Sequence, residues 1–300
     1  MTESAQTPFR AGFVSFVGRP NVGKSTLTNA LVGEKVAITS PQPQTTRRTI
    51  RGIVHRPDGQ LIIVDTPGMH RPRTLLGERL NALVKTTLGD VDVIGFCVPA
   101  NEKLGPGDRF INEQLDGFPR AKKVAIVTKM DTATREEAID QLARIGELRE
   151  WDAVIPLSAV AGEQLDVLTD VVLGLMPESP ALYPQETLTD EGDEDRVAEL
   201  IREAALDGVR DELPHSIAVT VEDRVEREDG LIEIYANIFV ERDSQKGIII
   251  GKGGSRLRSV GERARAGIEP LLGQRVFLSL RVKVLKDWQR DPKSLGRLGF

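Results

Sequence analysis

Short apolar runs rich in β-branched residues alternate with longer segments of helical periodicity through the first half of the chain. The runs predict strands at 13–17, 61–64, 91–98, 123–127 and 153–156. The segments between them predict helices at 24–32, 75–88, 108–115, 135–148 and 164–175. Such alternation is typical of an α/β fold with a mostly parallel sheet, whose ligands bind beyond the carboxyl ends of the strands.

The pattern changes after residue 176. Six acidic residues and no basic one fall within 186–195, which predicts a linker. The remaining chain predicts a helix ended by Pro214, two strands, a second helix and a last strand, at 193–213, 216–225, 231–241, 255–272 and 276–284. We therefore expect two domains, in keeping with a length of 300 residues.

Composition and charge narrow the class of protein. With 40% hydrophobic and 28% charged residues, the chain is expected to be globular. Because no apolar run could span a membrane, residues 1–7 do not resemble a leader and Cys97 has no disulfide partner, we expect a cytoplasmic protein. The net charge of -5 hides an asymmetry, since residues 241–300 hold fourteen Lys or Arg against six Asp or Glu. A basic end of this kind indicates a partner that carries phosphates.

The first predicted strand is followed by G-R-P-N-V-G-K-S at 18–25, which matches the phosphate-binding pattern G-x-x-x-x-G-K-S. Its glycines let successive backbone amides face a phosphate at the start of a helix. Lys24 is predicted to reach the β- and γ-phosphates and Ser25 to bind Mg²⁺. The predicted nucleotide contacts in this part are Gly18, Arg19, Pro20, Asn21, Val22, Gly23, Lys24, Ser25 and Thr26.

Two later segments favour guanine as the base. The sequences T-K-M-D at 128–131 and S-A-V at 158–160, each after a predicted strand, resemble the motifs N-K-x-D and S-A-K. Asp131 is predicted to accept both hydrogens of the guanine N1 and N2 edge, while the stem of Lys129 packs across the base. Thr128 stands where Asn is expected, so weaker contacts to the base and to the phosphate loop are expected. The predicted contacts here are Thr128, Lys129, Met130, Asp131, Ser158, Ala159 and Val160.

Two further segments favour a switch. The sequence D-T-P-G at 65–68 offers a carboxylate to support Mg²⁺ and a glycine amide to the γ-phosphate. The polar stretch 39–48 suits a loop that orders on the same ion and phosphate, with Thr46 favoured over Thr45 by analogy. Met69 stands where many GTPases place a water-orienting Gln, which predicts slow unassisted hydrolysis. These segments add Asp65, Thr66, Pro67, Gly68 and Met69 to the nucleotide site, and the predicted metal ligands are Ser25, Thr46 and Asp65.

The basic C-terminal part contains G-K-G-G at 251–254, between an apolar segment and a predicted helix. Glycines let a nucleic-acid backbone approach closely and the lysine supplies a cation, which is how KH domains clamp about four nucleotides. We predict RNA binding by Ile250, Gly251, Lys252, Gly253, Gly254, Arg256 and Arg258, with Arg263, Arg281, Lys283 and Lys286 also available. Trp288 is open to two interpretations, base stacking and anchoring of the C-terminal tail.

Taken together, these motifs resemble the Era GTPases of bacteria over nearly the whole chain. The resemblance implies a Ras-like P-loop GTPase domain, an acidic linker, an α+β type II KH domain and a tail, at 8–180, 181–195, 196–288 and 289–300. It also implies hydrolysis of GTP with Mg²⁺, binding to the 3′ end of small-subunit ribosomal RNA, and a role in assembly of the small ribosomal subunit. We expect a monomer, and the resemblance adds peripheral association with the inner membrane in some members.

The resemblance also bears on catalysis. In related GTPases an Asn at the position of Asn21 helps to hold K⁺ near the phosphates, so Asn21, Lys24 and Thr46 are the predicted catalytic residues. Two rival functions remain open at this point. One is a non-enzymatic RNA-binding assembly module with a structural nucleotide, and the other is an ATP-dependent kinase that shares the phosphate loop.

Overall fold

The computed structural model describes residues 8–42, 45–69 and 72–300. Pro43 and Gln44 of the predicted switch loop, and the N-terminal residues 1–7, lie outside the described residues. The described residues divide into two compact units. The first contains the described residues within 1–37, 46–71 and 80–190, and the second contains those within 38–45, 72–79 and 191–300. The units are not continuous in sequence, and the linear domain boundaries stay a prediction.

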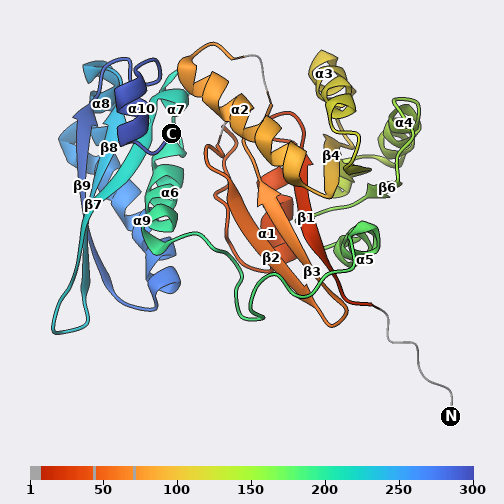
Figure 1. Cartoon of the computed structure of the whole chain (residues 1–300). Helices are drawn as coiled ribbons and strands as arrows, with labels where there is room; N and C mark the ends of the chain where they lie inside the picture. Colours follow the sequence, from red (N-terminus) through yellow and green to blue (C-terminus); the bar gives the residue numbers. More distant parts are fainter. Residues whose placement is uncertain (1–7, 43–44, 70–71) are drawn as a thin grey trace. The chain divides into compact units, whose positions relative to one another are not determined.

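The first unit is built on a six-stranded sheet in the order β2-β3-β1-β4-β5-β6 (Figure 1). The strands are β1 (Arg10–Val17), β2 (Ile50–Arg56), β3 (Gly59–Asp65), β4 (Val93–Pro99), β5 (Lys122–Thr128) and β6 (Ala153–Pro156). All neighbours pair in parallel except β2, which pairs antiparallel with β3. Strand β2 was not predicted, because it is an edge strand with polar residues at Arg51, His55 and Arg56 and lacks a continuous apolar run.

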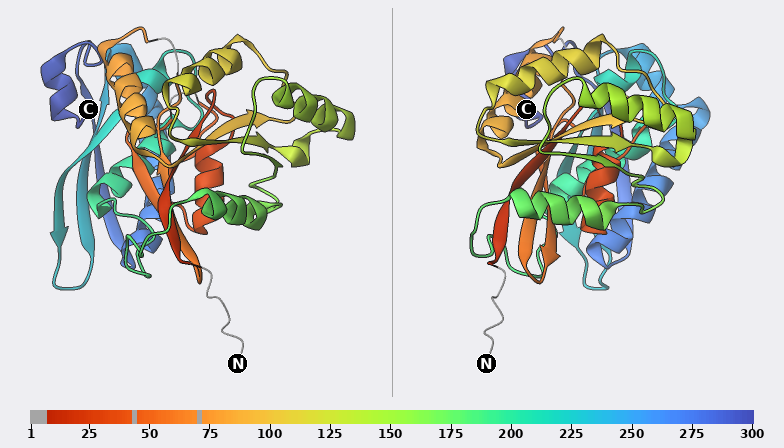
Figure 2. Two further views of the ribbon diagram at one scale, coloured as in Figure 1. Left: turned by 45° about the vertical axis from the view of Figure 1, so that its right-hand side comes forward. Right: turned by 90° about the vertical axis from the view of Figure 1, so that its right-hand side faces the viewer.

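Helices cover both faces of this sheet (Figure 2). They are α1 (Lys24–Val32), α2 (Leu75–Asp90), α3 (Pro106–Gln114), α4 (Arg135–Gly146) and α5 (Leu165–Leu175). One apolar core packs Leu27 of α1 and Leu168 of α5 against the sheet. The other packs Val84 of α2, Ile111 of α3 and Ile145 of α4 against the opposite face. The carboxyl ends of the parallel strands therefore share one edge, where the predicted site residues follow β1, β3, β5 and β6.

The second unit contains a three-stranded sheet in the order β7-β8-β9. Its elements are α6 (Asp193–Leu206), α7 (Leu213–Ser216), β7 (Ala218–Glu226), β8 (Ile232–Val240), α8 (Asp243–Ile250), α9 (Ser255–Leu272), β9 (Val276–Val284) and α10 (Pro292–Arg297). Strand β7 pairs antiparallel with β8, and β9 pairs parallel with it. One core holds Ile201 of α6, Ile238 of β8 and Ile268 of α9.

One prediction for this unit was wrong, and one helix was not predicted. The first helix ends at Leu206, and Pro214 lies in the first turn of α7, where its missing N–H costs nothing. The apolar segment before the glycine loop is the helix α8, although its three isoleucines favour a strand. The side chain of Gln245 fixes the start of α8, since its Oε1 accepts the amides of Glu241 at 2.9 Å and Arg242 at 3.1 Å.

The C-terminal tail is anchored by Trp288. Its side chain is fully buried, its Nε1 donates to the carbonyl of Ser216 at 3.0 Å, and its ring stacks on Phe300. A side chain in this environment cannot stack on a base, so anchoring is the correct interpretation of Trp288.

The predicted linker is bonded to the first unit for part of its length. The side chain of Gln60 accepts the amides of Leu182 and Tyr183 at 2.8 and 2.9 Å. Further along, Asp190 pairs with Arg51 of β2 at 2.7 Å. These bonds hold residues 182–190 against β3 and β2. Within the described residues, no helix has the length and apolar character needed to cross a bilayer.

Candidate nucleotide site and nucleic-acid interface

The phosphate loop connects β1 to α1 and curls around the amine of Lys24. The Nζ atom donates to the carbonyls of Gly18 at 3.1 Å and Arg19 at 2.9 Å. Burial lowers the pKa of Lys24, and the nearby Asp65 acts in the opposite direction. Gly23 precedes α1 with φ 102°, in the left-handed region, and a side chain on Gly18 would come within 2.5 Å of the carbonyl oxygen of Cys97. Both glycines are therefore required by the curl of this loop.

Three oxygen ligands meet beside this loop. The Oγ atom of Ser25 donates to Oδ2 of Asp65 at 2.8 Å, and Oγ1 of Thr46 lies 3.1 Å from Ser25 Oγ and 3.2 Å from the same carboxylate oxygen. The three residues of the predicted metal site thus lie together, although Ser25 and Asp65 are 40 residues apart in the sequence. The hydroxyl of Thr45 instead donates to the carbonyl of Gln42 at 2.7 Å. This geometry supports the choice of Thr46.

The chemistry of this cluster fits a hard cation. Asp65 is fully buried, and burial raises the pKa of its carboxyl above the ordinary value. Its Oδ1 atom has no hydrogen-bond partner among the described residues, and neither does Oγ1 of Thr66. Buried orphan oxygens are costly unless a ligand or water satisfies them. A set of two hydroxyls and one carboxylate, all oxygen, suits Mg²⁺.

The segment after β3 lies against the phosphate loop. A side chain added to Gly68 would have Nζ of Lys24 and the amide of Pro20 as its nearest neighbours, at 3.6 and 3.7 Å. The backbone of Gly68 therefore lies beside the amine of Lys24, where the sequence predicts the γ-phosphate. Met69 is buried in the apolar core under α2. Its side chain has no polar group that could orient water in place of the missing Gln.

The guanine motifs converge at the ends of β5 and β6. Oγ of Ser158 donates to Oδ1 of Asp131 at 2.5 Å, which fixes the carboxylate expected to read the base. Lys129 adopts φ 57°, a left-handed turn that carries the chain from β5 into the short helix at Met130–Thr132. Thr128 is buried and donates to the carbonyl of Val22 in the phosphate loop at 2.7 Å. The tie to the phosphate loop is thus present without the amide of an Asn.

Two acidic residues belong to this site and were not predicted. Arg19 of the phosphate loop pairs with Asp108 at 2.7 Å and with Glu102 at 3.1 Å. Glu102 also lies 3.7 Å from the amine of Lys129, so it joins the phosphate loop to the base motif. Burial opposes the charge of Arg19, but Asp108 and Glu102 together raise its pKa. Both residues follow β4 at the same edge of the sheet, and this position in the sequence could have indicated that they belong to the site.

The glycine loop of the second unit is exposed and shaped for close approach. Gly251, Gly253 and Gly254 have φ values of 72°, 59° and 77°, and the side chain of Lys252 is exposed. Beside the loop, a hollow of about 390 Å³ runs between α9 and β9. Its lining combines apolar side chains, among them Leu257, Phe277 and Leu280, with two arginines, Arg258 and Arg265, and one carboxylate, Glu262. Cations around an apolar floor suit a single-stranded nucleic acid, whose phosphates and bases need different surfaces.

Arg256 has a different role from the one expected. Its Nη2 donates to the carbonyls of Ala205 at 3.2 Å and Asp207 at 2.7 Å, so it satisfies the C-terminal end of α6. Burial lowers its pKa, and its Nε is buried without a partner among the described residues. Arg263 pairs with Asp207 as well. Lys252 and Arg258, both exposed, are better placed than Arg256 to meet phosphates.

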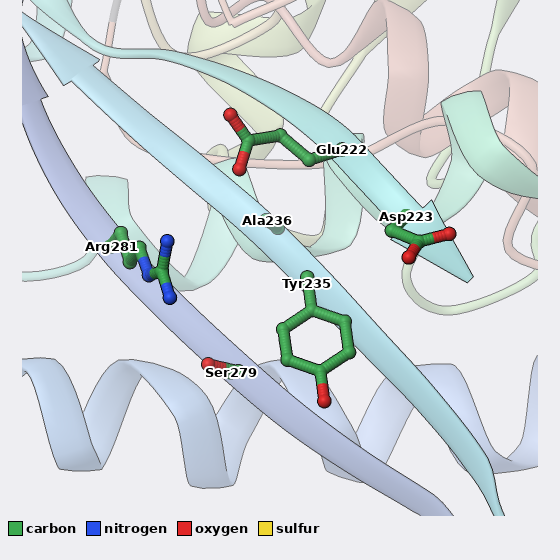
Figure 3. Close-up of a pocket in the computed structure, with 6 residues that line it drawn as sticks. All are labelled: Glu222, Asp223, Tyr235, Ala236, Ser279 and Arg281. Carbon is green, nitrogen blue, oxygen red and sulfur yellow. The ribbon is translucent and has the colours of Figure 1, made fainter. Parts of the chain in front are cut away.

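The opposite face of the same sheet is less suited to a polyanion. A hollow of about 250 Å³ there is lined by Glu222, Asp223, Tyr235, Ala236, Ser279 and Arg281 (Figure 3). Its charged lining residues are two carboxylates, Glu222 and Asp223, and one guanidinium, Arg281. The nearby Lys283 pairs with Glu222 at 2.7 Å, so part of the predicted basic surface is neutralised.

Comparison with known proteins identifies the family. The family model described as a 50S ribosome-binding GTPase matches residues 13–138, and the KH domain model matches residues 212–289. GTPase Era of Leifsonia xyli is 72% identical over 296 residues, which cover 98% of this chain and 100% of that protein. The chain belongs to the Era family of GTPases. Era of Streptomyces coelicolor is 62% identical over 308 residues, covering 99% of this chain and 97% of the relative.

Solved structures of Era proteins agree with the fold. Aquifex aeolicus Era bound to GDP and AlF₄⁻ has a TM-score of 0.93 and 35% identity, over 97% of this chain and 99% of that one. An Era structure with MgGDPNP and nucleotides 1506–1542 of 16S ribosomal RNA also has a TM-score of 0.93, with 36% identity and the same coverage. The predicted Era resemblance, the Ras-like GTPase domain followed by a KH domain, and the identification as a GTPase are confirmed. Membership of this family excludes the kinase and the non-enzymatic module.

Proposed function

We propose that this Era-family GTPase is a Mg²⁺-dependent switch. In its GTP-bound state it binds the 3′ end of small-subunit ribosomal RNA, and this binding assists assembly of the small ribosomal subunit. The observation that carries the proposal is the meeting of Ser25, Thr46 and Asp65 around one carboxylate oxygen. Thr46 lies between the other two residues in sequence, 21 residues after Ser25 and 19 before Asp65, at the end of the loop that follows α1. A site that requires Thr46 can therefore distinguish GTP from GDP through the order of this loop.

Each side chain of the site has a role in this scheme. Lys24 balances charge on the β- and γ-phosphates, Asp131 reads guanine and Ser158 holds that carboxylate in place. Ser25 and Thr46 would hold Mg²⁺ and Asp65 would support it, and the ion would offset phosphate charge. Because Met69 offers no hydrogen bond to water, we expect hydrolysis to be slow without a partner.

The RNA part of the proposal rests on the loop 250–254 and on the relative that was solved with 16S ribosomal RNA. The loop presents Lys252 and glycine backbone to solvent, beside the cationic hollow that includes Arg258. The test uses the full chain and an RNA that copies the 3′ end of 16S ribosomal RNA. We expect tighter binding with a non-hydrolysable GTP analogue than with GDP, and tighter than to a scrambled RNA of equal length. Equal affinity in all these conditions would contradict the proposal.

Potassium is a further part of the proposal. Asn21 lies in the phosphate loop with φ 64° and is exposed, at the position that holds K⁺ in related GTPases. A second cation there would offset charge that develops on the phosphates during hydrolysis. We expect faster hydrolysis in K⁺ than in Na⁺ buffer, and no such difference in Asn21→Ala. Equal rates of the parent protein in the two buffers would remove K⁺ from the scheme.

We also propose that the protein acts as a cytoplasmic monomer, with contact to the inner membrane limited to peripheral association. Sedimentation gives the oligomeric state. Flotation with vesicles of bacterial lipid tests the association, because a protein without affinity for the bilayer stays at the bottom of the gradient.

A further inference from the structure

Arg202 of α6 is an arginine with almost no exposure to solvent. Its side chain is 2% exposed, and Glu199, one turn earlier on α6, accepts from its Nε at 2.9 Å and from its Nη2 at 2.6 Å. A guanidinium buried this far is costly unless acceptors meet its donors. Its Nη1 has no hydrogen-bond partner among the described residues, so the bonds of Nε and Nη2 are the ones that hold the side chain in place. Nη2 has a second acceptor, the backbone carbonyl of Thr45, which lies 157 residues earlier in the chain.

Two more bonds attach the same short segment to the neighbourhood of Arg202. The amide of Thr39 donates to Oε1 of Glu203 at 2.9 Å, and Nε2 of Gln42 donates to the carbonyl of Val209 at 2.8 Å. The segment Ile38–Thr45 accordingly belongs to the second compact unit together with α6. The next residue, Thr46, belongs to the first unit and to the proposed metal site.

Thr45 and Thr46, on either side of one of the points where the division falls, are joined by a single peptide bond. The carbonyl of Thr45 and the amide of Thr46 share one planar peptide group, and no cis peptide occurs among the described residues. In a trans peptide the C=O and N–H bonds point in opposite directions. An acceptor bond that fixes the carbonyl of Thr45 consequently fixes the direction of the Thr46 amide.

We propose that Arg202 is a positioning residue for recognition of the γ-phosphate. This inference rests on the proposed function, in which the Thr46 hydroxyl joins Ser25 and Asp65 and its amide meets the γ-phosphate. Arg202 holds the Thr45 carbonyl so that the amide on the other side of the peptide is already oriented for GTP. GDP has no γ-phosphate, so the bond strengthens binding of GTP alone.

The test compares two nucleotides on the full chain with Mg²⁺ present. Arg202→Met removes the donors and keeps the apolar stem of the side chain. We expect the affinity for a non-hydrolysable GTP analogue to fall about tenfold, as for loss of one charge-assisted hydrogen bond, while GDP affinity changes less than about twofold. Arg202→Lys keeps the charge without the planar fork and is expected to lose part of the preference. An equal loss for both nucleotides, or no loss for the analogue, would overturn the assignment.

Controls separate this inference from a folding defect. Arg224→Met removes an arginine that pairs with Asp193 in the first turn of α6, at 3.4 Å, and should leave the GTP-to-GDP preference unchanged. Melting curves identify a variant that does not fold, and Arg202→Lys then provides the decisive measurement.

A third variant separates this inference from the proposed function. Thr46→Ala removes the hydroxyl of the metal site. If Thr46→Ala keeps the full preference for the analogue, the proposed function fails. If Thr46→Ala loses the preference and both Arg202 variants retain it, only the role of Arg202 fails.

Discussion

The hydroxyl of Thr128 donates to the carbonyl of Val22 at 2.7 Å and so ties the base motif to the phosphate loop. The sequence suggested that replacing Asn by Thr would weaken this tie. The bond is present because the tie needs one donor, which a hydroxyl supplies. Thr128 lacks the second polar group that an Asn would have. Any weakening of nucleotide binding should therefore come from contacts to the guanine base and not from the contact to the phosphate loop.

Removal of this hydroxyl should weaken nucleotide binding. In Thr128→Val, the carbonyl of Val22 loses its donor in a buried environment, so the free energy of unfolding should fall by about 1 kcal/mol and nucleotide affinity by about tenfold. Titration with a fluorescent GDP and urea unfolding measure the two effects. Thr128→Asn is the control and should bind at least as tightly as the parent. A Val variant with unchanged affinity would show that the tie is not needed.

Selection of guanine should depend on the carboxylate of Asp131. Asp131→Asn exchanges one acceptor for a donor that meets the guanine N1 and N2 hydrogens, so affinity for GDP should fall at least about a hundredfold. Xanthosine diphosphate has an oxygen in place of the N2 group and should be bound better by the variant than by the parent. Asp140→Asn, on the surface of α4 and paired with Arg144, is the matched control. A variant that still prefers GDP would exclude Asp131 as the base-reading residue.

The raised pKa of Asp65 predicts a pH dependence of stability without ligands. Its folded-state pKa lies above the ordinary value of 3.8, chiefly because of burial. The folded state therefore binds a proton that the unfolded chain has already released, so the free energy of unfolding falls as pH rises through this window. Asp65→Asn should flatten the fall in nucleotide-free, Mg²⁺-free protein and should abolish Mg²⁺-dependent nucleotide affinity. Urea unfolding from pH 4 to pH 7 measures the slope.

The exposed Asp170 of α5 provides the comparison for this pH experiment, since Asp170→Asn changes no buried group. The same slope in Asp65→Asn and in the parent would mean that another group causes the pH dependence. Greater stability of Asp65→Asn at neutral pH would show that the parent keeps a costly buried carboxylate for the sake of its ligand.

Local chemistry explains which parts of this molecule could be predicted from sequence. The helices Lys24–Val32 and Ser255–Leu272 were predicted with correct bounds, because glycines at each end and apolar periodicity define them within a few residues. Strand β2 could not be predicted, since it depends on pairing with β3. The helix α8 was missed because the side chain of Gln245, in its first turn, accepts amides of residues that follow directly on a predicted strand.

The site residues also divide into those that could be predicted from local sequence and those that could not. Lys24, Asp65 and Asp131 follow strand ends in recognisable motifs, and their convergence follows from the parallel sheet. Glu102, Asp108 and Arg202 belong to no motif, and their roles arise from partners far away in sequence, as in the bond from Arg202 to Thr45. Pattern alone cannot assign partners at such separations, whatever the strength of the motif beside them.

RNA affinity should depend on Lys252 more than on other lysines of the second unit. Lys252 is exposed within the glycine loop, whereas Lys283 already pairs with Glu222 on the far face of the sheet. Lys252→Glu should weaken binding of the 3′-end RNA and reduce the slope of log affinity against log salt by about one, as expected for loss of one phosphate contact. Lys283→Glu carries the same change of charge and should alter affinity much less. If the two variants weaken binding equally at every salt concentration, the effect is one of net charge and the loop is not the RNA contact.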